Sequence, residues 1–351
     1  MTRRKAINPD WPAVAASLAS RVSRGDLHPE AMRRALAEHR RESRRGGRPS
    51  RWALAFSGGA DSLALLLLLW AEAPGRWDRD FVVLHFNHRL RGRAADDDEE
   101  FCREVCAALG VAFVTGRWEN PPRAAGEAAA RAARHAFFAR EMKRRRLRLL
   151  WLAHQQDDIA ETMLMRLTRG SGTAGLAAPR PVQPQNDGRL HLRPMLTLTK
   201  KRIVAALRSA GATWREDESN LSDRFLRNRI RRSILPVLAK ASGRDVLAAC
   251  ALSRERLQED DEALEAWLDE LAPLGQRAAV LDLGCLAGKP RALWRRALHR
   301  WLLAAQPETD LSRAGFEQLL AAVEQGRDTR FSLGRSAFAI VRARKLSLKR
   351  A

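Results

Sequence analysis

The chain has 351 residues, with 63 Lys or Arg against 41 Asp or Glu, so its formal net charge is +22. Its length and its 45% hydrophobic content allow two or three domains, whereas its longest apolar run, residues 63–71, covers less than half of the roughly 20 residues that a membrane-spanning helix needs. The positive charge favours a polyanionic partner, nucleic acid first, and the alternative is an Arg-rich surface that water alone solvates.

The cysteines are scattered and form no CxxC pair, which argues against a zinc ribbon and against a disulfide framework. Cys102 and Cys106 lie four residues apart in a helical pattern. We interpret them as small buried hydrophobic side chains rather than metal ligands. The basic start of the chain is followed by no apolar segment of the signal-peptide type, so a soluble cytoplasmic protein is expected.

Residues 1–50 are expected to form a basic helical N-terminal extension that ends in a linker, "RRGGRPS". Strands and helices alternate after it. The strands are expected at 51–56, 81–86, 111–115 and 148–154, and the helices at 61–72, 98–110, 124–145 and 157–168. Short apolar strands between helical patterns predict βαβ units, and therefore an α/β fold with a Rossmann-like parallel sheet covered on both faces.

A Gly- and Pro-rich stretch follows Thr168, and a further strand or loop and two helices follow that. From about residue 240 the pattern is mainly helical, and short strands are expected at the end of the chain. We therefore expect a domain over residues 51–240 and a mainly helical C-terminal domain over 241–351.

The stretch "SGGADS", residues 57–62, lies between the first expected strand and its helix. A Gly-rich turn of this kind directs backbone N–H groups at an anion, helped by the helix dipole. Asp61 would repel a phosphate unless a cation lay between them, and Mg²⁺ is the natural bridge. Neither the G-x-x-x-x-G-K-[ST] loop nor G-x-G-x-x-G fits these residues. The alternative is a polar turn that merely caps the helix.

"SGGADS" resembles the loop of the PP-loop ATP pyrophosphatases, which cleave ATP between its α- and β-phosphates. Other stretches are similar to the tRNA(Ile)-lysidine synthetases within that superfamily, and the resemblance covers roughly residues 52–240. These stretches are "HFNHRLRGRAADDDEEFC", "EAAARAARHAFF", "AHQQDDIAETMLMRLTRGSGTAGL", "RPMLTLTKKRI" and "EDESNLSDRFLRNRIRRSILP". The chain departs from the family at His135, where Tyr is usual, and at Gln155 and Ile159, where His and Gln are usual. We assign no catalysis to Gln155 or Ile159.

The resemblance implies a sheet of the PP-loop, adenine nucleotide alpha hydrolase-like type, and a ligase that uses ATP and Mg²⁺. ATP would adenylate the C2 oxygen of the wobble cytidine, C34, in the CAU anticodon of tRNA(Ile). The ε-amine of free L-lysine would then attack C2, releasing AMP after the pyrophosphate. Residues 241–351 would recognise the tRNA. The oligomeric state is open, with a homodimer as one option, and no membrane is involved.

Site residues follow from the loop chemistry and from the resemblance. The catalytic residues would be Asp61, Arg131 and Asp158, of which Asp61 and Asp158 would hold the metal. The nucleotide would contact Ser57, Gly58, Gly59, Ala60, Asp61, Ser62, His85, Asn87, His88 and His154. The tRNA or the lysine would contact Arg134, Lys200, Lys201, Arg227, Asn228 and Arg231.

Each assignment has a structural alternative. Asp157 and Asp158 could cap the following helix, histidines at strand ends could be purely structural, and Arg131 and Arg134 could lie on a solvated helix face. Two rival functions are also open. One is a PP-loop tRNA sulfur transferase, which would need sulfur-handling cysteines, and the other is a non-catalytic RNA-binding protein.

Overall fold

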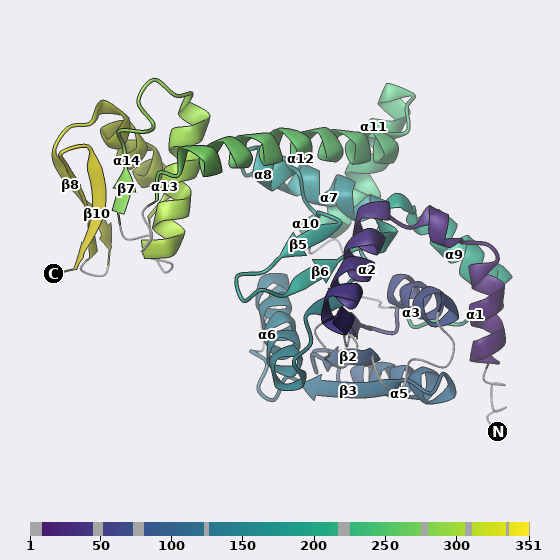
Figure 1. The fold of residues 1–351 in the computed structure, drawn as a ribbon. Coiled ribbons are helices and arrows are strands. Elements are labelled where there is room, and N and C mark those ends of the chain that lie inside the picture. Colours follow the sequence, from purple (N-terminus) through teal and green to yellow (C-terminus); the bar gives the residue numbers. More distant parts are fainter. Residues whose placement is uncertain are drawn as a thin grey trace. The chain divides into compact units, whose positions relative to one another are not determined.

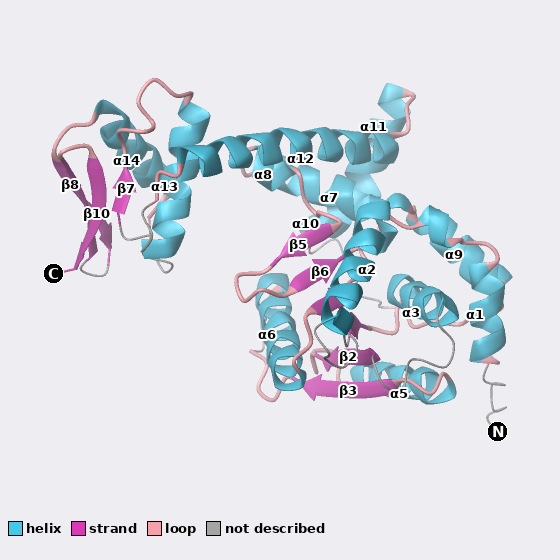
Figure 2. Cartoon of the chain, in the orientation of Figure 1, coloured by secondary structure: helices cyan, strands magenta, loops and turns pink. Residues whose placement is uncertain are grey.

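The computed structural model describes residues 9–44, 52–72, 81–122, 126–216, 225–274, 280–305, 311–334 and 337–350. The chain divides into two compact units, Met1–Glu255 (unit 1) and Arg256–Ala351 (unit 2). Each unit has its own hydrophobic cluster. Figure 1 follows the elements along the chain, and Figure 2 separates helices from strands.

Unit 1 is built on a sheet that has six strands among the described residues, in the order β3-β2-β1-β4-β6-β5. The strands are β1 (Trp52–Ala55), β2 (Phe81–Asn87), β3 (Ala112–Arg117), β4 (Leu149–Trp151), β5 (Val182–Pro184) and β6 (Leu190–Leu192). All neighbours pair in parallel except β5 with β6. The chain moves outward from β1 to β3 and then returns to place β4 on the other side of β1. The switch in strand order therefore lies between β1 and β4, where ligands bind in sheets of this kind.

Helices cover both faces of this sheet. The α-helices described between residues 9 and 242 are α1 (Trp11–Ala19), α2 (Pro29–Arg44), α3 (Ala60–Glu72), α5 (Arg93–Ala108), α6 (Glu127–Arg145), α7 (Gln156–Leu167), α8 (Thr173–Leu176), α9 (Lys200–Ser209), α10 (Leu226–Arg229) and α11 (Leu235–Ser242). Short turns of helix are η1 (Arg24–Asp26), η2 (Pro194–Thr197) and the π-helical η4 (Ile230–Ile234). The predicted parallel α/β fold is confirmed.

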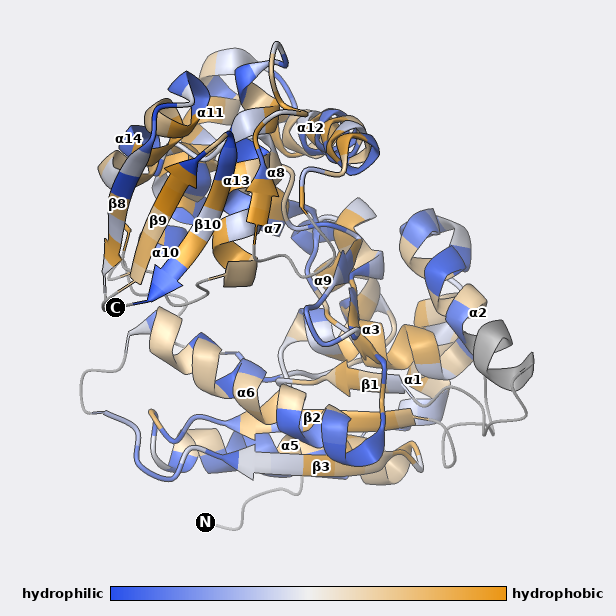
Figure 3. Cartoon of the chain, turned by 60° about the vertical axis from the view of Figure 1, so that its left-hand side comes forward, coloured by the Kyte–Doolittle hydropathy of each residue, from blue (hydrophilic) through white to orange (hydrophobic). Residues whose placement is uncertain are grey.

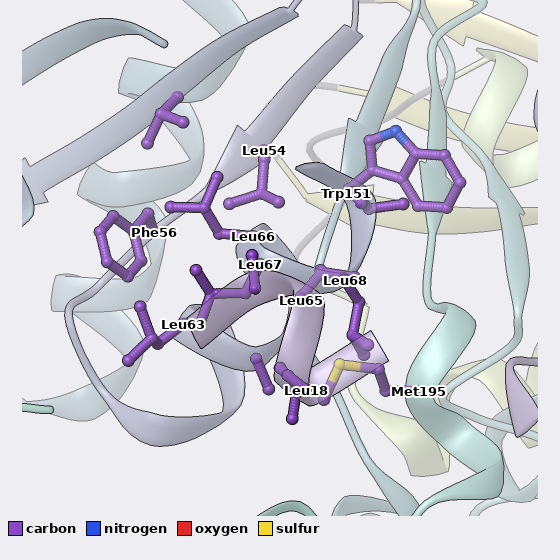
Figure 4. Packing of buried hydrophobic residues seen from close by; sticks show 14 of the residues in the cluster. Leu18, Leu54, Phe56, Leu63, Leu65, Leu66, Leu67, Leu68, Trp151 and Met195 are labelled. Carbon is purple, nitrogen blue, oxygen red and sulfur yellow. The ribbon is translucent and has the colours of Figure 1, made fainter. Parts of the chain in front are cut away.

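The two faces of the sheet are buried in separate clusters, as alternation along a strand requires. Leu54 of β1 packs with α1, α3, α5 and α9, whereas its neighbour Ala53 packs with Phe137 and Phe138 of α6. In Figure 3, β1 and α3 are drawn largely in orange, the hydrophobic end of the scale. Figure 4 shows the side chains of α3 and β1 in the larger cluster, together with Leu18, Trp151 and Met195.

The N-terminal helices belong to the core of unit 1. Trp11, Val14, Ala15 and Leu18 of α1 are buried in the larger cluster. This differs from the expected separate extension, because one apolar face of α1 packs on α3 instead of remaining exposed. The expected linker at 45–50 lies outside the described residues.

Unit 2 combines helices with an antiparallel sheet of order β7-β10-β9-β8. Its elements are the C-terminal part of α12 (Val246–Leu271), then β7 (Val280–Asp282), α13 (Arg291–Ala305), α14 (Arg313–Gln325), β8 (Thr329–Gly334), β9 (Ala337–Arg342) and β10 (Lys345–Arg350). The expected helices and final strands are both present. The division falls inside α12, later than the expected boundary at 240, because helical periodicity continues through the point where packing partners change.

Among the residues that the structure describes, no helix is long and apolar enough to cross a membrane.

Candidate nucleotide-binding site

The loop from β1 to α3 is held closed by its own serines. The Ser62 hydroxyl donates to the Gly59 carbonyl at 3.0 Å and accepts from the Ser57 backbone N–H at 3.2 Å. The two hydroxyls of Ser57 and Ser62 lie 3.1 Å apart. These bonds replace the backbone pairing that the chain loses as the strand turns into the helix. They fix the turn in front of the N-terminus of α3, where N–H groups of the first turn have no helical partner.

Glycine is present at the two loop positions, 58 and 59, for different structural reasons. Gly58 has φ +85°, and a Cβ there would lie 3.1 Å from the Cys102 sulfur and 3.3 Å from Cδ1 of Phe101. The fold itself therefore requires glycine at 58. A Cβ at Gly59 would meet nothing closer than 3.5 Å, the Ser57 hydroxyl. The fold leaves room at 59, so glycine there keeps the backbone open to a ligand.

Asp61, in the first turn of α3, forms an ion pair with Lys200 at the start of α9. The Lys200 ammonium lies 2.8 Å from both carboxylate oxygens. Burial raises the pKa of the Asp61 carboxyl, the Lys200 ammonium opposes this rise, and the Asp158 carboxylate adds to it. Two carboxylates repel each other here, and one of them already holds an ammonium, so this is a place where a cation is stabilised.

The end of β4 supplies the second part of the site. Asp158 Oδ2 accepts from the Gln155 backbone N–H at 2.9 Å, and Gln155 Oε1 accepts from the Asp157 N–H at 2.6 Å. Asp157 Oδ2 accepts from the Lys200 N–H at 2.9 Å and so ties α7 to α9. The structure therefore shows the capping role for Asp158, while its metal contact stays a prediction. The substituted Gln155 has a structural task, capping α7.

A buried glutamate on α7 gathers two arginines from the segment after α9. Glu161, which is fully buried, accepts from Arg227 Nε at 2.7 Å and from Arg231 Nε at 2.5 Å. Arg227 also lies 3.3 Å from Asp158 Oδ1. Burial raises the pKa of Glu161, and its two arginine partners oppose that rise. Arg227 and Arg231, expected to contact tRNA, thus lie in an ion-pair network beside Asp158.

Arg131 and Arg134 of α6 bring further positive charge to the same end of the sheet. Burial, followed by the nearby Arg131 and Arg227, lowers the pKa of Arg134 to about 10. Arg131 has its pKa lowered by burial and by Arg227. Arginines that repel one another in a partly desolvated place favour a bound anion, since the anion removes the repulsion. The solvated-face alternative fits Arg134 poorly.

Two of the strand-end histidines, His85 and His154, are held neutral. His154 Nδ1 accepts from Arg193 Nε at 3.1 Å, and burial and Arg193 hold the pKa of His154 well below its usual range. His85 Nδ1 lies 2.9 Å from the Phe56 carbonyl, and burial lowers its pKa. His88 packs edge-on against Phe86, with 4.9 Å between ring centroids. His85 therefore fixes the strand that leads into the loop, and its nucleotide contact stays a prediction.

Asn87 is fully engaged inside the protein. Its amide nitrogen donates to Asp96 Oδ1 at 2.9 Å and to Glu99 Oε2 at 3.1 Å, and its amide oxygen accepts from the Arg89 N–H at 2.9 Å. Asn228 is also buried, whereas Lys201 is exposed on α9. Asn87 and Asn228 therefore support the walls of the site from inside, and ligand contacts of all three stay predictions.

Sequence reasoning missed three residues that build the site. Glu161 and Arg193 anchor the arginine network and His154. Arg215 donates its N–H to the Gly58 carbonyl at 3.0 Å and its Nε to Asp98 at 2.6 Å, bracing the loop from outside. Glu161 could have been found, since it lies three residues after Asp158 on one helix face. No sequence signal points to Arg215.

The described residues contain no group of three or more His, Cys, Asp or Glu side chains that could hold a metal ion. Any metal at Asp61 would therefore have at most two protein carboxylates and would rely on ligand oxygens. That donor set is the one that Mg²⁺ uses when it binds together with substrate phosphates. The residues present thus fit Mg²⁺ held jointly with a nucleotide.

A parallel sheet with a Gly-Ser loop at its switch point defines a nucleotide-binding α/β domain. Residues 30–238 match the family model of the PP-loop domain, ATP_bind_3. The chain belongs to this PP-loop family, and the family supports ATP as the nucleotide that the chain uses.

The sequence is also similar to curated proteins named tRNA(Ile)-lysidine synthase. One from Geobacter sulfurreducens is 38% identical over 281 residues, covering 76% of this chain and 57% of that protein. One from Pseudomonas syringae pv. tomato is 37% identical over 294 residues, covering 79% of this chain and 63% of that protein. The chain thus spans about three fifths of the length of these relatives, and the resemblance noted in its motifs is confirmed.

Among solved structures, the chain is similar to the U34-tRNA thiolase NcsA from Methanococcus maripaludis. The TM-score is 0.51 and the identity 16%, over 65% of this chain and 80% of that one. This likeness supports the fold alone.

Proposed function

We propose that the chain is a tRNA(Ile)-lysidine synthetase, a ligase that joins L-lysine to C2 of C34 in tRNA(Ile) with the CAU anticodon. The observation that carries the proposal is the meeting of two segments at adjacent strand ends. Residues 57–62 follow β1 and residues 153–161 follow β4, and both resemble the family's motifs. A protein that acts on tRNA with ATP works where tRNA is, so we infer a cytoplasmic location.

In this proposal the loop binds the phosphates of ATP through the N-terminus of α3, with Gly59 leaving room for them. Asp61 and Asp158 would hold Mg²⁺, which would neutralise charge on the phosphates when bound. The Lys200 ammonium already pairs with Asp61 beside the loop. From there it would also contact the phosphates of a bound ATP. Arg131 and Arg134 would bind the negative charge of the departing pyrophosphate or of the RNA backbone. The residues supply placement and charge neutralisation, which is what transfer to phosphorus requires.

The chemistry then proceeds in two steps. The C2 oxygen of cytidine attacks the α-phosphorus, pyrophosphate leaves, and an adenylated cytidine forms. The lysine ε-amine attacks C2, the C–O bond to AMP breaks, and the amine proton is lost to base or water. His154 is held neutral and its Nδ1 accepts from Arg193, so its Nε2 carries the proton and can donate a hydrogen bond near this place.

Unit 2 offers a surface that fits RNA. Ala337, Ala339 and Val341 of β9 are buried, so Phe338, Ile340 and Arg342 point to the opposite face. The cations on that face are Arg330, Arg342, Lys345 and Lys349. The Arg330 guanidinium lies 3.7 Å from the centroid of the Phe338 ring. The residues of β8–β10 include no carboxylate, and on the neighbouring strand β7 Asp282 lies opposite Lys345. We call this the β8–β10 face, and its excess of cations favours a polyanion.

The cysteines support ligation over sulfur transfer. Cys102 and Cys106 are fully buried on α5, and burial raises the pKa of both thiols, which keeps them protonated. Cys250 and Cys285 are free and partly buried, and burial also raises the pKa of each. A sulfur carrier needs an accessible thiolate, which neither buried cysteine provides.

The decisive experiment offers both acceptor chemistries to the protein. Purified protein with ATP, Mg²⁺ and tRNA(Ile) should incorporate labelled L-lysine and release AMP and pyrophosphate, and should do neither with C34 changed to U. Incorporation of labelled sulfur without lysine would replace the proposal by the thiolation alternative. Tight tRNA binding without pyrophosphate release would leave a non-catalytic RNA-binding protein.

A further inference from the structure

The segment η2–α9 carries Lys200 into the site and is held there on its site-facing side. Lys200 contacts Asp61 through its ammonium and Asp157 through its N–H. The Leu198 carbonyl, two residues earlier, accepts from the Gln156 N–H at 2.8 Å. The position of this segment thus sets where the Lys200 ammonium lies relative to Asp61.

The same segment is held on its other side by the N-terminal part of the chain. Arg202 of α9 donates to Asp26 Oδ1 at 2.7 Å, and the Thr197 hydroxyl donates to the Asp26 carbonyl at 2.5 Å. The His28 N–H donates to the Pro194 carbonyl at 2.6 Å. Asp26 is itself fixed by Ser23, whose N–H and hydroxyl donate to Asp26 Oδ2 at 2.8 and 3.0 Å. We call these contacts of Asp26 and His28 the N-terminal tie.

The N-terminal tie lies before the region that the PP-loop family model covers, since that match begins at residue 30. It is nevertheless anchored in the core. Trp11 and Leu18 precede it in α1, and Leu27, within it, is also buried. Because buried side chains hold this turn in the core, its hydrogen bonds can keep η2 and α9 in a fixed position.

We propose that Asp26 and Arg202 are positioning residues that set the Lys200 ammonium for the phosphate loop. They touch neither nucleotide nor acceptor and act through α9. The proposal rests on nucleotide binding at the loop and not on which acceptor is modified. It gives residues 9–28 a function within the active domain.

The test compares variants by two measurements on the full-length protein. Asp26→Asn keeps the shape and the main-chain contacts but removes the charge that pairs with Arg202, and Arg202→Gln removes the pair from the other end. Each should speed hydrogen exchange of the amides in residues 198–206 of the free protein. Each should also weaken ATP binding, measured by calorimetry with Mg²⁺, by about five- to tenfold. Asp26→Glu, which keeps the carboxylate, should restore most of the affinity.

Arg24→Ala is the matched control. Arg24 lies in the same turn, but its ion pair at 3.5 Å goes to Glu72 at the end of α3 and not to a residue of α9. It should change neither ATP affinity nor exchange of residues 198–206.

A double-mutant comparison separates positioning from general stability. Lys200→Ala should weaken ATP binding, and Asp26→Asn added to it should have no further effect. An additive loss in the Lys200→Ala background, unchanged affinity in Asp26→Asn, or unchanged exchange of residues 198–206 would each overturn the proposal. The exchange measurement needs no ATP and no tRNA, so failure of lysine transfer leaves it decisive.

Discussion

Gly58 and Gly59 are adjacent in the sequence, but only one of them is required by the fold. Gly58 combines positive φ with close contacts to Cys102 and Phe101, so the loop cannot form with a side chain there at no cost. Gly59 has neither constraint. At the scale of single residues, the structure thus separates a glycine kept for folding from one kept for a ligand.

Exchanging each glycine for alanine should separate the two roles. Gly58→Ala should lower the free energy of unfolding by about 1–3 kcal/mol, because left-handed backbone with a Cβ is strained. Gly59→Ala should leave that free energy within about 0.5 kcal/mol of wild type but weaken ATP binding at least about tenfold. Urea unfolding and calorimetric ATP titration measure the two effects. Equal ATP affinity in Gly59→Ala and wild type would show that phosphates do not approach this backbone.

His28 makes stability depend on pH. Burial, then Arg254 and Arg33, lower its pKa from 6.5 to about 4, so folded His28 stays neutral where the unfolded chain would bind a proton. Stability from this residue is complete above pH 6.5 and is lost as pH falls towards 4. His28→Gln should lower the proton uptake on unfolding at pH 5 by up to one proton, measured from urea unfolding between pH 5 and 7.5. An unchanged pH slope would show that His28 is protonated in the folded protein.

At the scale of elements, one buried carboxylate joins α7 to the helical segment α10–η4. Ala160 of α7, Ile230 and Leu235 form a small hydrophobic cluster, and Glu161 adds its pairs with Arg227 and Arg231. Partly buried apolar side chains, Leu164 and Leu226 among them, pack against this cluster. The ion pairs join particular partners on the two elements, so they add to the specific register between α7 and α10.

Removing the carboxylate should loosen this junction. Glu161→Ala leaves two arginines facing each other and should cost about 3–5 kcal/mol of unfolding free energy. Glu161→Gln, which keeps one acceptor, should cost less, and Arg229→Ala, an exposed neighbour on α10, should stay within about 0.5 kcal/mol. Chemical unfolding of the three variants provides the comparison. A cost for Glu161→Ala no larger than for Arg229→Ala would show that the network is not stabilising.

At the scale of the whole molecule, the Lys and Arg residues behind the net charge of +22 differ in whether a carboxylate pairs with them. The β8–β10 face carries cations without any carboxylate on its strands. Other cations of unit 2 are already paired: Arg291 lies 3.3 Å from Glu317 and 3.2 Å from Glu324, and Arg295 lies 3.6 Å from Glu317. The net charge therefore overstates the number of cations that can bind a polyanion, because some of them are already paired with carboxylates.

Salt dependence should tell these two kinds of cation apart. Each phosphate contact contributes about −0.7 to −0.9 to the slope of log K against log salt for nucleic-acid binding. Changing Arg330, Arg342, Lys345 and Lys349 to Gln should make the slope for tRNA shallower by up to about three units, with ATP affinity unchanged. The control pair Arg291→Gln and Arg295→Gln should leave the slope as it was. Equal slopes in all three proteins would remove the β8–β10 face from the tRNA contact.

The sequence by itself determined the βαβ order, the strand-to-helix loop at 57–62 and the basic surface. Each of these depends on residues close together in the chain: alternating apolar runs make strands and helices, and a Gly-Ser turn exposes N–H groups wherever it stands. The same locality explains why the strand-end residues after β1 and β4 could be grouped in advance, since carboxyl ends of parallel strands share one edge.

Only the tertiary structure decided which side chains meet there. Lys200 reaches Asp61 across 139 positions of sequence, Arg215 supports Gly58, and Asp26 holds Arg202. These contacts arise because β4 returns beside β1 and α1 packs on α3. A contact between residues distant in the sequence depends on strand order and on packing. The local patterns of a single sequence predict neither of these.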